Sequence, residues 1–189
     1  MGDWSPDGEW LAFSRVGEVE EKGLWLRNPD GVNLVHLTEG DDYNPNWSPD
    51  GKHIVFVRQT GPTDGGLDIF LASRLKDGTW QDNAELTRLT KHEANNDSPV
   101  WSPGGNTIAF VSYRDGNAEI YTMEEDGSNP LRLTTNEADD LEPVWSPGGD
   151  HLAFVSHLYG PGEIFMMDNE GGNQRRLTTN DAEDYSPDW

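Results

Sequence analysis

One short sequence, Trp-Ser-Pro followed by Asp or Gly and then by Gly, recurs along the chain at a nearly constant interval. A further tryptophan, Trp189, ends the chain without the rest of this motif. It follows Pro187-Asp188 in the same way that Trp47 follows Pro45-Asn46. Successive tryptophans lie 43, 54, 44 and 44 residues apart. A period of this length, with short apolar runs between turn residues, is typical of proteins that stack one small structural unit several times. The repeated tryptophans are Trp4, Trp47, Trp101, Trp145 and Trp189.

Each unit contains short apolar runs that are separated by turn residues. In the third unit these runs are 108–111 and 120–123, followed by a more polar run that ends in Leu133-Thr134. The runs are too short for core helices and are bounded by turn residues, so they indicate buried strands. Proline presets the first turn position and glycine supplies the left-handed one, which favours tight hairpins between the strands.

A fourth strand is expected in the Pro-x-Trp segment that opens each next unit. Proline cannot donate to a sheet ladder, so this strand should lie at an edge. Four short antiparallel strands with such an edge make one blade of a β-propeller, and in a blade the innermost strand is an edge that faces the channel. The sequence therefore predicts an all-β propeller of four-stranded antiparallel blades, either a closed four-bladed ring or part of a larger propeller. The expected blades are 4–46, 47–100, 101–144 and 145–189.

The charge of the chain excludes several classes of partner. Its 189 residues carry a formal net charge of −22, which repels nucleic acids and anionic membrane surfaces and attracts basic protein surfaces. There is no cysteine, so disulfides and thiolate metal sites are excluded. No apolar run is long enough to span a bilayer, and we see no signal peptide ahead of Trp4. Eight tryptophans supply enough buried area to argue against disorder.

The repeat resembles the TolB-type propeller repeat, a relative of the WD-repeat blade. The resemblance rests on Pro-x-Trp-Ser-Pro-Asp-Gly, an Ile-Ala-Phe-Val-like strand, an Ile-Tyr-like strand, Asp-Gly and a closing Leu-Thr, and it covers essentially the whole chain. It implies one of three settings: a periplasmic adaptor like TolB that binds partner proteins, the gating propeller of a prolyl-oligopeptidase-type serine peptidase, or a propeller-based polysaccharide lyase. An extracytoplasmic location follows from the first, and the missing signal peptide leaves the cytoplasm as the alternative.

A search for catalytic groups finds none with the expected spacing. The five histidines show no metal-ligand spacing on a helix, and the repeated serines belong to turns. The peptidase setting would need a Gly-x-Ser-x-Gly elbow, which these residues lack. We therefore expect no enzymatic activity from these residues, and we favour a scaffold for protein–protein interaction. The alternative is an accessory or gating propeller of a peptidase or carbohydrate-active enzyme whose catalytic part lies outside these residues.

Polar residues six and five positions before each repeated tryptophan are the candidate metal ligands. They should lie where each innermost strand begins and so ring one mouth of the channel. Oxygen ligands of this kind suit Ca²⁺; alternatively they accept backbone N–H groups and lock neighbouring blades together, or they dock a basic partner segment. The candidate ring comprises Asp41, Asp42, Asn96, Asp139, Asp140, Glu183 and Asp184.

The second unit is about ten residues longer than the others. Its insertions fall in 59–66 and 75–83 and lie at hairpin turns. They are either tolerated surface variation or a partner-contact loop anchored by Trp80.

Both ends of the chain fall at the same point of the repeat. Trp4 lacks most of the strand that should precede it, and Trp189 lacks the turn that should follow. We therefore expect four blades of a larger or assembled propeller, a homodimer included.

Overall fold

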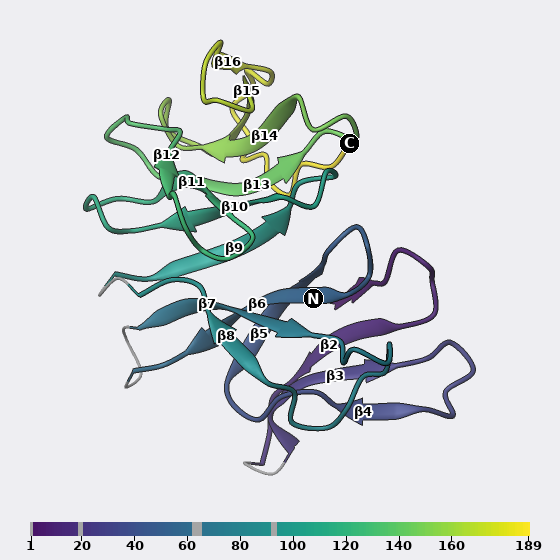
Figure 1. The fold of residues 1–189 in the computed structure, drawn as a ribbon. Helices are drawn as coiled ribbons and strands as arrows, with labels where there is room; N and C mark the ends of the chain where they lie inside the picture. Colours follow the sequence, from purple (N-terminus) through teal and green to yellow (C-terminus); the bar gives the residue numbers. More distant parts are fainter. Residues whose placement is uncertain (1, 19–20, 62–65, 92–93) are drawn as a thin grey trace.

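The computed structural model describes residues 2–18, 21–61, 66–91 and 94–189, which form four sheets of four antiparallel strands each (Figure 1). Within each sheet the strands pair in chain order, so the predicted all-β architecture of four-stranded antiparallel blades is confirmed. No helix in the described part of the chain is long and apolar enough to cross a membrane. The first two sheets contain β1 (Gly2–Trp4), β2 (Leu11–Arg15), β3 (Gly23–Arg27) and β4 (Leu34–His36), then β5 (Asp42–Trp47), β6 (His53–Gln59), β7 (Leu67–Ser73) and β8 (Leu86–Arg88). The other two contain β9 (Asn96–Trp101), β10 (Thr107–Ser112), β11 (Glu119–Glu124) and β12 (Leu131–Arg132), then β13 (Asp140–Trp145), β14 (His151–Ser156), β15 (Glu163–Asp168) and β16 (Arg175–Arg176).

Each sheet begins with the strand that ends at a repeated tryptophan. Trp47 pairs with Ile54 of β6, so β5 belongs to the same sheet as the strands that follow it. The tight turn after Trp47, in which the Gly51 N–H donates to the Ser48 carbonyl at 2.9 Å, joins two strands of one sheet. The unit boundary expected at residue 47 therefore falls inside the second sheet, which begins at Asp42.

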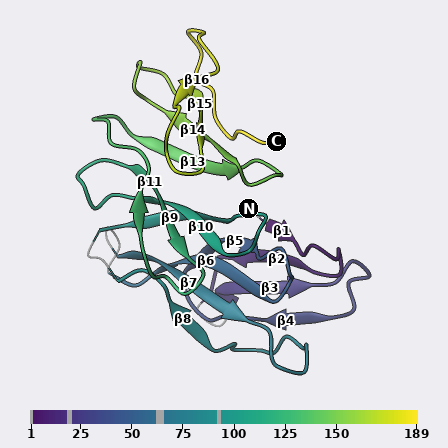
Figure 2. The same cartoon turned by 45° about the horizontal axis from the view of Figure 1, so that its top comes forward.

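The strands that carry the prolines, β5, β9 and β13, are the inner edges of their sheets, as their sequence predicts, and β1 takes the same place in the first sheet. β1, β5, β9 and β13 each stand at the end of their sheet, and β5 contacts both β1 and β9, while β9 also contacts β13. Figure 2 shows the sheets succeeding one another in chain order, with the fourth at one end of the array. The inner strands are thus brought together although they are far apart in the sequence.

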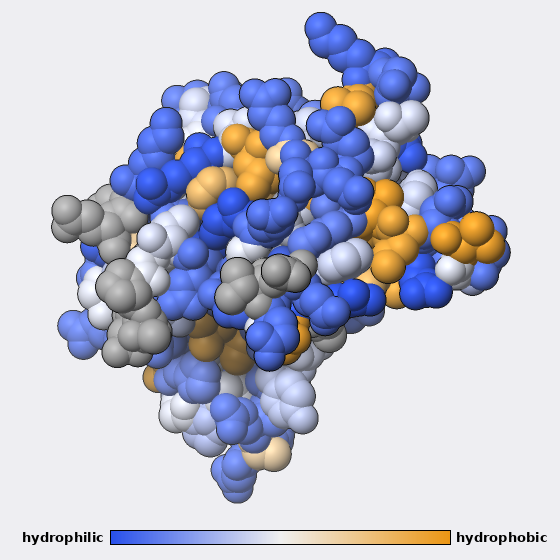
Figure 3. All heavy atoms as spheres, turned by 90° about the horizontal axis from the view of Figure 1, so that it is seen from below, coloured by the Kyte–Doolittle hydropathy of each residue, from blue (hydrophilic) through white to orange (hydrophobic). Residues whose placement is uncertain are grey.

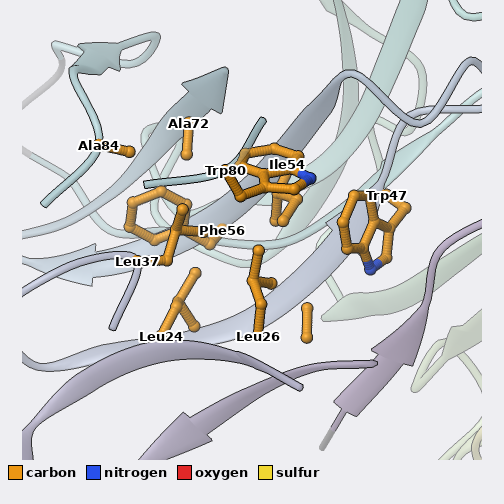
Figure 4. Packing of buried hydrophobic residues seen from close by; sticks show 10 residues of the cluster. Leu24, Leu26, Leu37, Trp47, Ile54, Phe56, Ala72, Trp80 and Ala84 are labelled. Atoms are coloured by element: carbon orange, nitrogen blue, oxygen red, sulfur yellow. The ribbon is translucent and has the colours of Figure 1, made fainter. Parts of the chain in front are cut away.

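The hydrophobic core lies between neighbouring sheets. One cluster joins Leu24 and Leu26 of the first sheet to Ile54 and Phe56 of the second (Figure 4). Two further clusters join the second sheet to the third and the third to the fourth. Each sheet therefore buries its apolar side chains against a neighbour, which is how stacked repeats are stabilised.

Turn glycines bring the third-to-fourth strand hairpins close to the preceding sheet. Gly127 and Gly171 have φ of +84° and +83°, and a Cβ atom on either would lie 2.7 Å or 2.8 Å from the carbonyl oxygen of Leu89 or Leu133. A side chain at these positions would be strained by the backbone conformation and would also collide with the neighbouring sheet. Glycine in this part of the repeat therefore sets how tightly two sheets approach.

Candidate functional site: the groove of the inner strands

A bulge interrupts the inner strand of the second, third and fourth sheets directly before its proline. Asn44, Ser98 and Glu142 adopt left-handed φ values of 51°, 51° and 53°, and the pairing register shifts at the same place. Ser186, before Pro187, has a φ of 53° as well. Because a bulge re-aims the side chains around it, four successive pre-proline segments present the same irregular surface.

These segments line one groove of about 520 Å³, which we call the inner groove. Glu142 and Asp188 are exposed in it, and Asp3 is half-buried at its edge. The described residues that line it include these three carboxylates and no Lys, Arg or His. Much of the apolar part of its wall is formed by the prolines of three inner strands and of the C-terminal segment: Pro45, Pro99, Pro143 and Pro187.

Hydrogen bonds between inner strands fix the walls of this groove. The Trp47 backbone N–H donates to Asp3 Oδ2 at 2.9 Å, and the Trp101 N–H donates to Asn46 Oδ1 at 2.8 Å. The Trp47 indole N–H also donates to the Asp3 carbonyl at 3.1 Å. The same indole-to-carbonyl bond joins Trp145 to Val100 and Trp189 to Val144, each at 3.3 Å. The residue before each tryptophan therefore connects its strand to the next one.

The electrostatics of the inner groove favour a cation. Burial raises the pKa of Asp3, against the opposing effect of the hydrogen bonds that it accepts from Trp47, Trp4 and Asn46. Behind the groove, burial and then the Asp97 carboxylate raise the pKa of Tyr43 to about 12. A surface with several acceptors and no competing cation attracts ammonium and guanidinium groups. The groove can thus recognise a basic chain segment, whereas its described lining holds no pairing of a nucleophile with a base.

The carboxylates of the first predicted acidic pair, Asp41 and Asp42, form ion pairs with basic side chains. Asp41 forms an ion pair with Lys22 at 2.7 Å. Asp42 is buried and accepts hydrogen bonds from Arg58 Nε at 2.7 Å, Arg58 Nη2 at 2.6 Å and Thr38 Oγ1 at 2.5 Å. The Arg58 contacts lie within the second sheet, whereas Lys22 and Thr38 belong to segments next to β3 and β4 of the first sheet. All of these donors are side chains, and none is a backbone N–H group.

Of the second and third pairs, Asn96 bonds mainly to side chains of its own sheet, whereas Asp139 bonds to the preceding one. Asn96 Oδ1 accepts hydrogen bonds from Ser112 Oγ at 2.9 Å and Arg114 Nη2 at 3.2 Å. Asp139 Oδ1 accepts the Ala118 backbone N–H at 2.9 Å. Asp140 is fully buried; its Oδ2 accepts Asn136 Nδ2 at 2.6 Å, and its Oδ1 accepts no hydrogen bond from the residues that the structure describes. Burial raises the pKa of Asp140, and the nearby Glu119 charge adds to this shift.

The last pair lies near the C-terminal end of the chain. Asp184 Oδ2 accepts Asn180 Nδ2 at 2.7 Å, and Glu183 is exposed. Nowhere in the described ranges do three His, Asp or Glu side chains gather closely enough to hold a metal ion. A Ca²⁺ site formed by the candidate ring therefore stays a prediction, and the described residues contain no preformed cluster of ligands for it.

Trp80, expected as a partner anchor, lies in the core. It is 8% exposed and packs edge-on against Trp47 with ring centroids 5.3 Å apart (Figure 4). It belongs to the cluster of buried residues between the first and second sheets. Ala84 then donates its N–H to the Leu37 carbonyl at 2.8 Å. Part of this insertion thus packs the second sheet on the first; 62–65, in the other insertion, lie outside the described residues.

A repeated polar network was missed by reading the sequence. In the third sheet, the Glu119 carboxylate accepts Arg132 Nη2 at 2.7 Å and Thr134 Oγ1 at 2.5 Å. The same contacts recur for Asp68 with Arg88 and Thr90, and for Glu163 with Arg176 and Thr178. The signal was present, because Arg-Leu-Thr recurs and an acidic residue is the first or second residue of each of these third strands. The network is structural and lies outside the inner groove.

The sequence of this chain is similar to a known family model and to several known proteins. Residues 81–189 match the family model of the TolB beta propeller domain. An uncharacterized protein of Agrobacterium fabrum is 32% identical over 116 residues, which cover 59% of this chain and 39% of that protein. The Tol-Pal system protein TolB of Francisella tularensis is 29% identical over 117 residues, which cover 59% of this chain and 24% of that protein. These matches thus span about two-fifths or less of the relatives' length.

Solved structures match the fold over nearly all of the chain. A structure assigned as TolB from Agrobacterium tumefaciens is 31% identical with a TM-score of 0.79, over 94% of this chain and 64% of that one. TolB from Acinetobacter baumannii is 24% identical with a TM-score of 0.68, over 96% and 41%. A puromycin hydrolase is 17% identical with a TM-score of 0.77, over 97% and 31%. Propellers of this shape therefore occur in an enzyme as well as in TolB.

Proposed function

Because the chain belongs to the TolB beta propeller domain family, we propose that it is a non-catalytic scaffold that binds a protein partner in its inner groove. The single observation that carries this proposal is the lining of the groove, which combines three carboxylates with no basic side chain among its described residues. The partner would contribute an extended basic segment, since Lys and Arg complement exposed acceptors. By its relation to TolB, the proposed location is the periplasm or another extracytoplasmic compartment.

A peptide titration tests the proposal. A fluorescent peptide rich in Lys and Arg is titrated with the protein, and binding is followed by anisotropy at two salt concentrations. We expect saturable binding that Glu142→Gln combined with Asp188→Asn weakens by about tenfold, because hydrogen bonds to charged groups contribute most of such a contact. The matched control, Glu125→Gln with Asp181→Asn, removes two exposed carboxylates outside the groove and should bind as the unaltered protein does. Equal weakening in both variants would refute a specific groove.

The second candidate function is an accessory propeller of a hydrolase or carbohydrate-active enzyme. It is favoured by the similarity to puromycin hydrolase, in which the matched part is 31% of the enzyme chain. The decisive observation is the sequence that flanks this propeller in its parent protein. A Gly-x-Ser-x-Gly elbow in an adjoining domain would establish this alternative, and a parent without a catalytic domain would exclude it.

A further inference from the structure

A second groove, between the second and third sheets, concentrates positive charge on an acidic protein. It has a volume of about 450 Å³, and Arg88, Lys91 and Arg114 line it. The chain holds 13 Lys and Arg residues against 35 Asp and Glu residues, so three cations on one groove are unexpected. Its apolar wall consists of Leu89 and Pro130, with buried Phe110 and Met123 beneath. We call this surface the cationic groove.

Arg114 is held in place by neutral groups only. Its Nε donates to Ser112 Oγ at 2.8 Å, its Nη2 donates to Asn96 Oδ1 at 3.2 Å, and its guanidinium lies 4.5 Å from the Tyr121 ring centroid. No described carboxylate forms an ion pair with it. Arg114 is therefore oriented without being neutralised.

The carboxylates near the cationic groove cancel this charge only in part. Asp68 pairs with Arg88 at 2.6 Å, but it is 1% exposed and its oxygens are also occupied by Thr60 and Thr90. Asp126, in the opposite hairpin turn, itself lines the groove; it is exposed and accepts the Ser128 N–H at 2.9 Å, and it offsets one of the three positive charges. An anion in the groove would thus meet three basic side chains without displacing an existing partner of Arg114.

The repeat supplies two internal comparisons. At the four equivalent sequence positions, the cationic groove carries three positive charges and no negative one, from Arg88, Lys91, Asn96 and Arg114. Between the first and second sheets these positions carry two negative charges and no positive one, from His36, Glu39, Asp42 and Thr60. Between the third and fourth sheets they carry one of each, from Arg132, Thr135, Asp140 and Leu158. The excess positive charge is thus found only at the interface between the second and third sheets among the three compared. The fold of the repeat does not require it.

We infer that the cationic groove binds a small organic phosphate, with the phosphate at Arg88, Lys91 and Arg114 and a short apolar body along Leu89 and Pro130. A phosphate monoester offers three terminal oxygens and a charge near −2. Guanidinium groups match such oxygens in geometry as well as charge. The volume is within the range of small-molecule sites. This site is separate from the inner groove and does not depend on the proposed scaffold function.

Calorimetry with phenyl phosphate as the probe tests the inference. We expect saturable one-to-one binding to the full chain that weakens as salt is added. Inorganic phosphate should bind more weakly because it has no apolar body, and phenol should not bind because it has no charge. No saturable binding of phenyl phosphate would overturn the proposal, and equal affinity for inorganic phosphate would overturn its apolar part.

Two variants copied from the sibling interface make the test specific. Asn96→Asp gives Arg114 the carboxylate that Asp42 gives Arg58, and Lys91→Glu copies Glu39. We expect each to weaken phenyl phosphate binding by about tenfold or more, since each adds a competing or repelling charge. Lys52→Gln, which removes one positive charge from an exposed turn outside the groove, should leave the affinity unchanged. Equal affinity of Asn96→Asp and Lys52→Gln would overturn the assignment.

Discussion

At the scale of single residues, one repeat position shows how partners decide what a carboxylate does. Asp42 and Asp140 both precede their tryptophan by five residues. Arg58 neutralises Asp42, whereas Oδ1 of the buried Asp140 has no hydrogen-bond partner in the described part of the chain. The sequence predicted both as candidate site residues because the position is obvious from the repeat. Their partners could not be predicted, since these come from other strands and change from sheet to sheet.

This contrast predicts opposite effects of the same substitution. Asp140→Asn should stabilise the fold by about 1 kcal/mol near pH 7, because it removes a buried negative charge that lies near Glu119. Asn96, at the equivalent position of the preceding sheet, donates to the Ala94 carbonyl at 2.9 Å, so an amide has a precedent there. Asp42→Asn should destabilise the fold, because it leaves Arg58 without its carboxylate. Urea unfolding of both variants measures the two changes.

The pH dependence follows from the raised pKa of Asp140. Burial raises this pKa above its usual value of 3.8, so the folded state binds a proton more readily than the unfolded state. The cost of Asp140 is present above the folded pKa and disappears as the pH falls below the unfolded one. The advantage of Asp140→Asn should therefore shrink as the pH is lowered from 7 to below 3.8. An advantage that does not change over this range would contradict the account.

At the scale of elements, strand order was predictable and local irregularity was not. Turn residues and apolar runs predicted four strands per unit, and proline placed one of them at the inner edge. The left-handed residues before proline, such as Asn44 and Glu142, leave no mark in the sequence, because Asn, Ser and Glu all occupy this position. The sequence offered Trp80 as the anchor of a partner-contact loop, but the side chain is buried, for a related reason. Its burial depends on packing partners from other strands, such as Trp47, which the sequence does not reveal.

Three turn glycines test the packing between sheets. Gly78, Gly127 and Gly171 have φ near +84°, but only the last two would bring a Cβ into contact with the preceding sheet. Gly78→Ala should cost about 1 kcal/mol for the left-handed conformation. Gly127→Ala and Gly171→Ala should each cost roughly 1–3 kcal/mol more, because the neighbouring backbone must move. Equal losses in thermal unfolding would show that the hairpins do not set the spacing of the sheets.

At the scale of the whole molecule, the repeated tryptophans distinguish interior interfaces from end faces. Trp47, Trp101 and Trp145 are 5%, 7% and 9% exposed, whereas Trp4 and Trp189 are each 51% exposed. Figure 3 shows a mostly hydrophilic surface interrupted by separate hydrophobic patches. Faces that resemble buried interfaces favour association with another sheet of the same kind. We therefore expect self-association of this chain in sedimentation experiments, weakened by Trp4→Ala. A monomer at all concentrations would contradict this expectation.

The central claim is that the inner groove, and not the acidic surface at large, receives a basic partner segment. A spin-labelled Lys- and Arg-rich peptide tests it by nuclear magnetic resonance, because the label broadens signals only near its binding site. The account predicts broadening of the amide signals of Gly2, Val100 and Val144, which line the groove, and unchanged signals in the outer strands. Broadening spread over the acidic outer turns, with the groove signals unaffected, would contradict it.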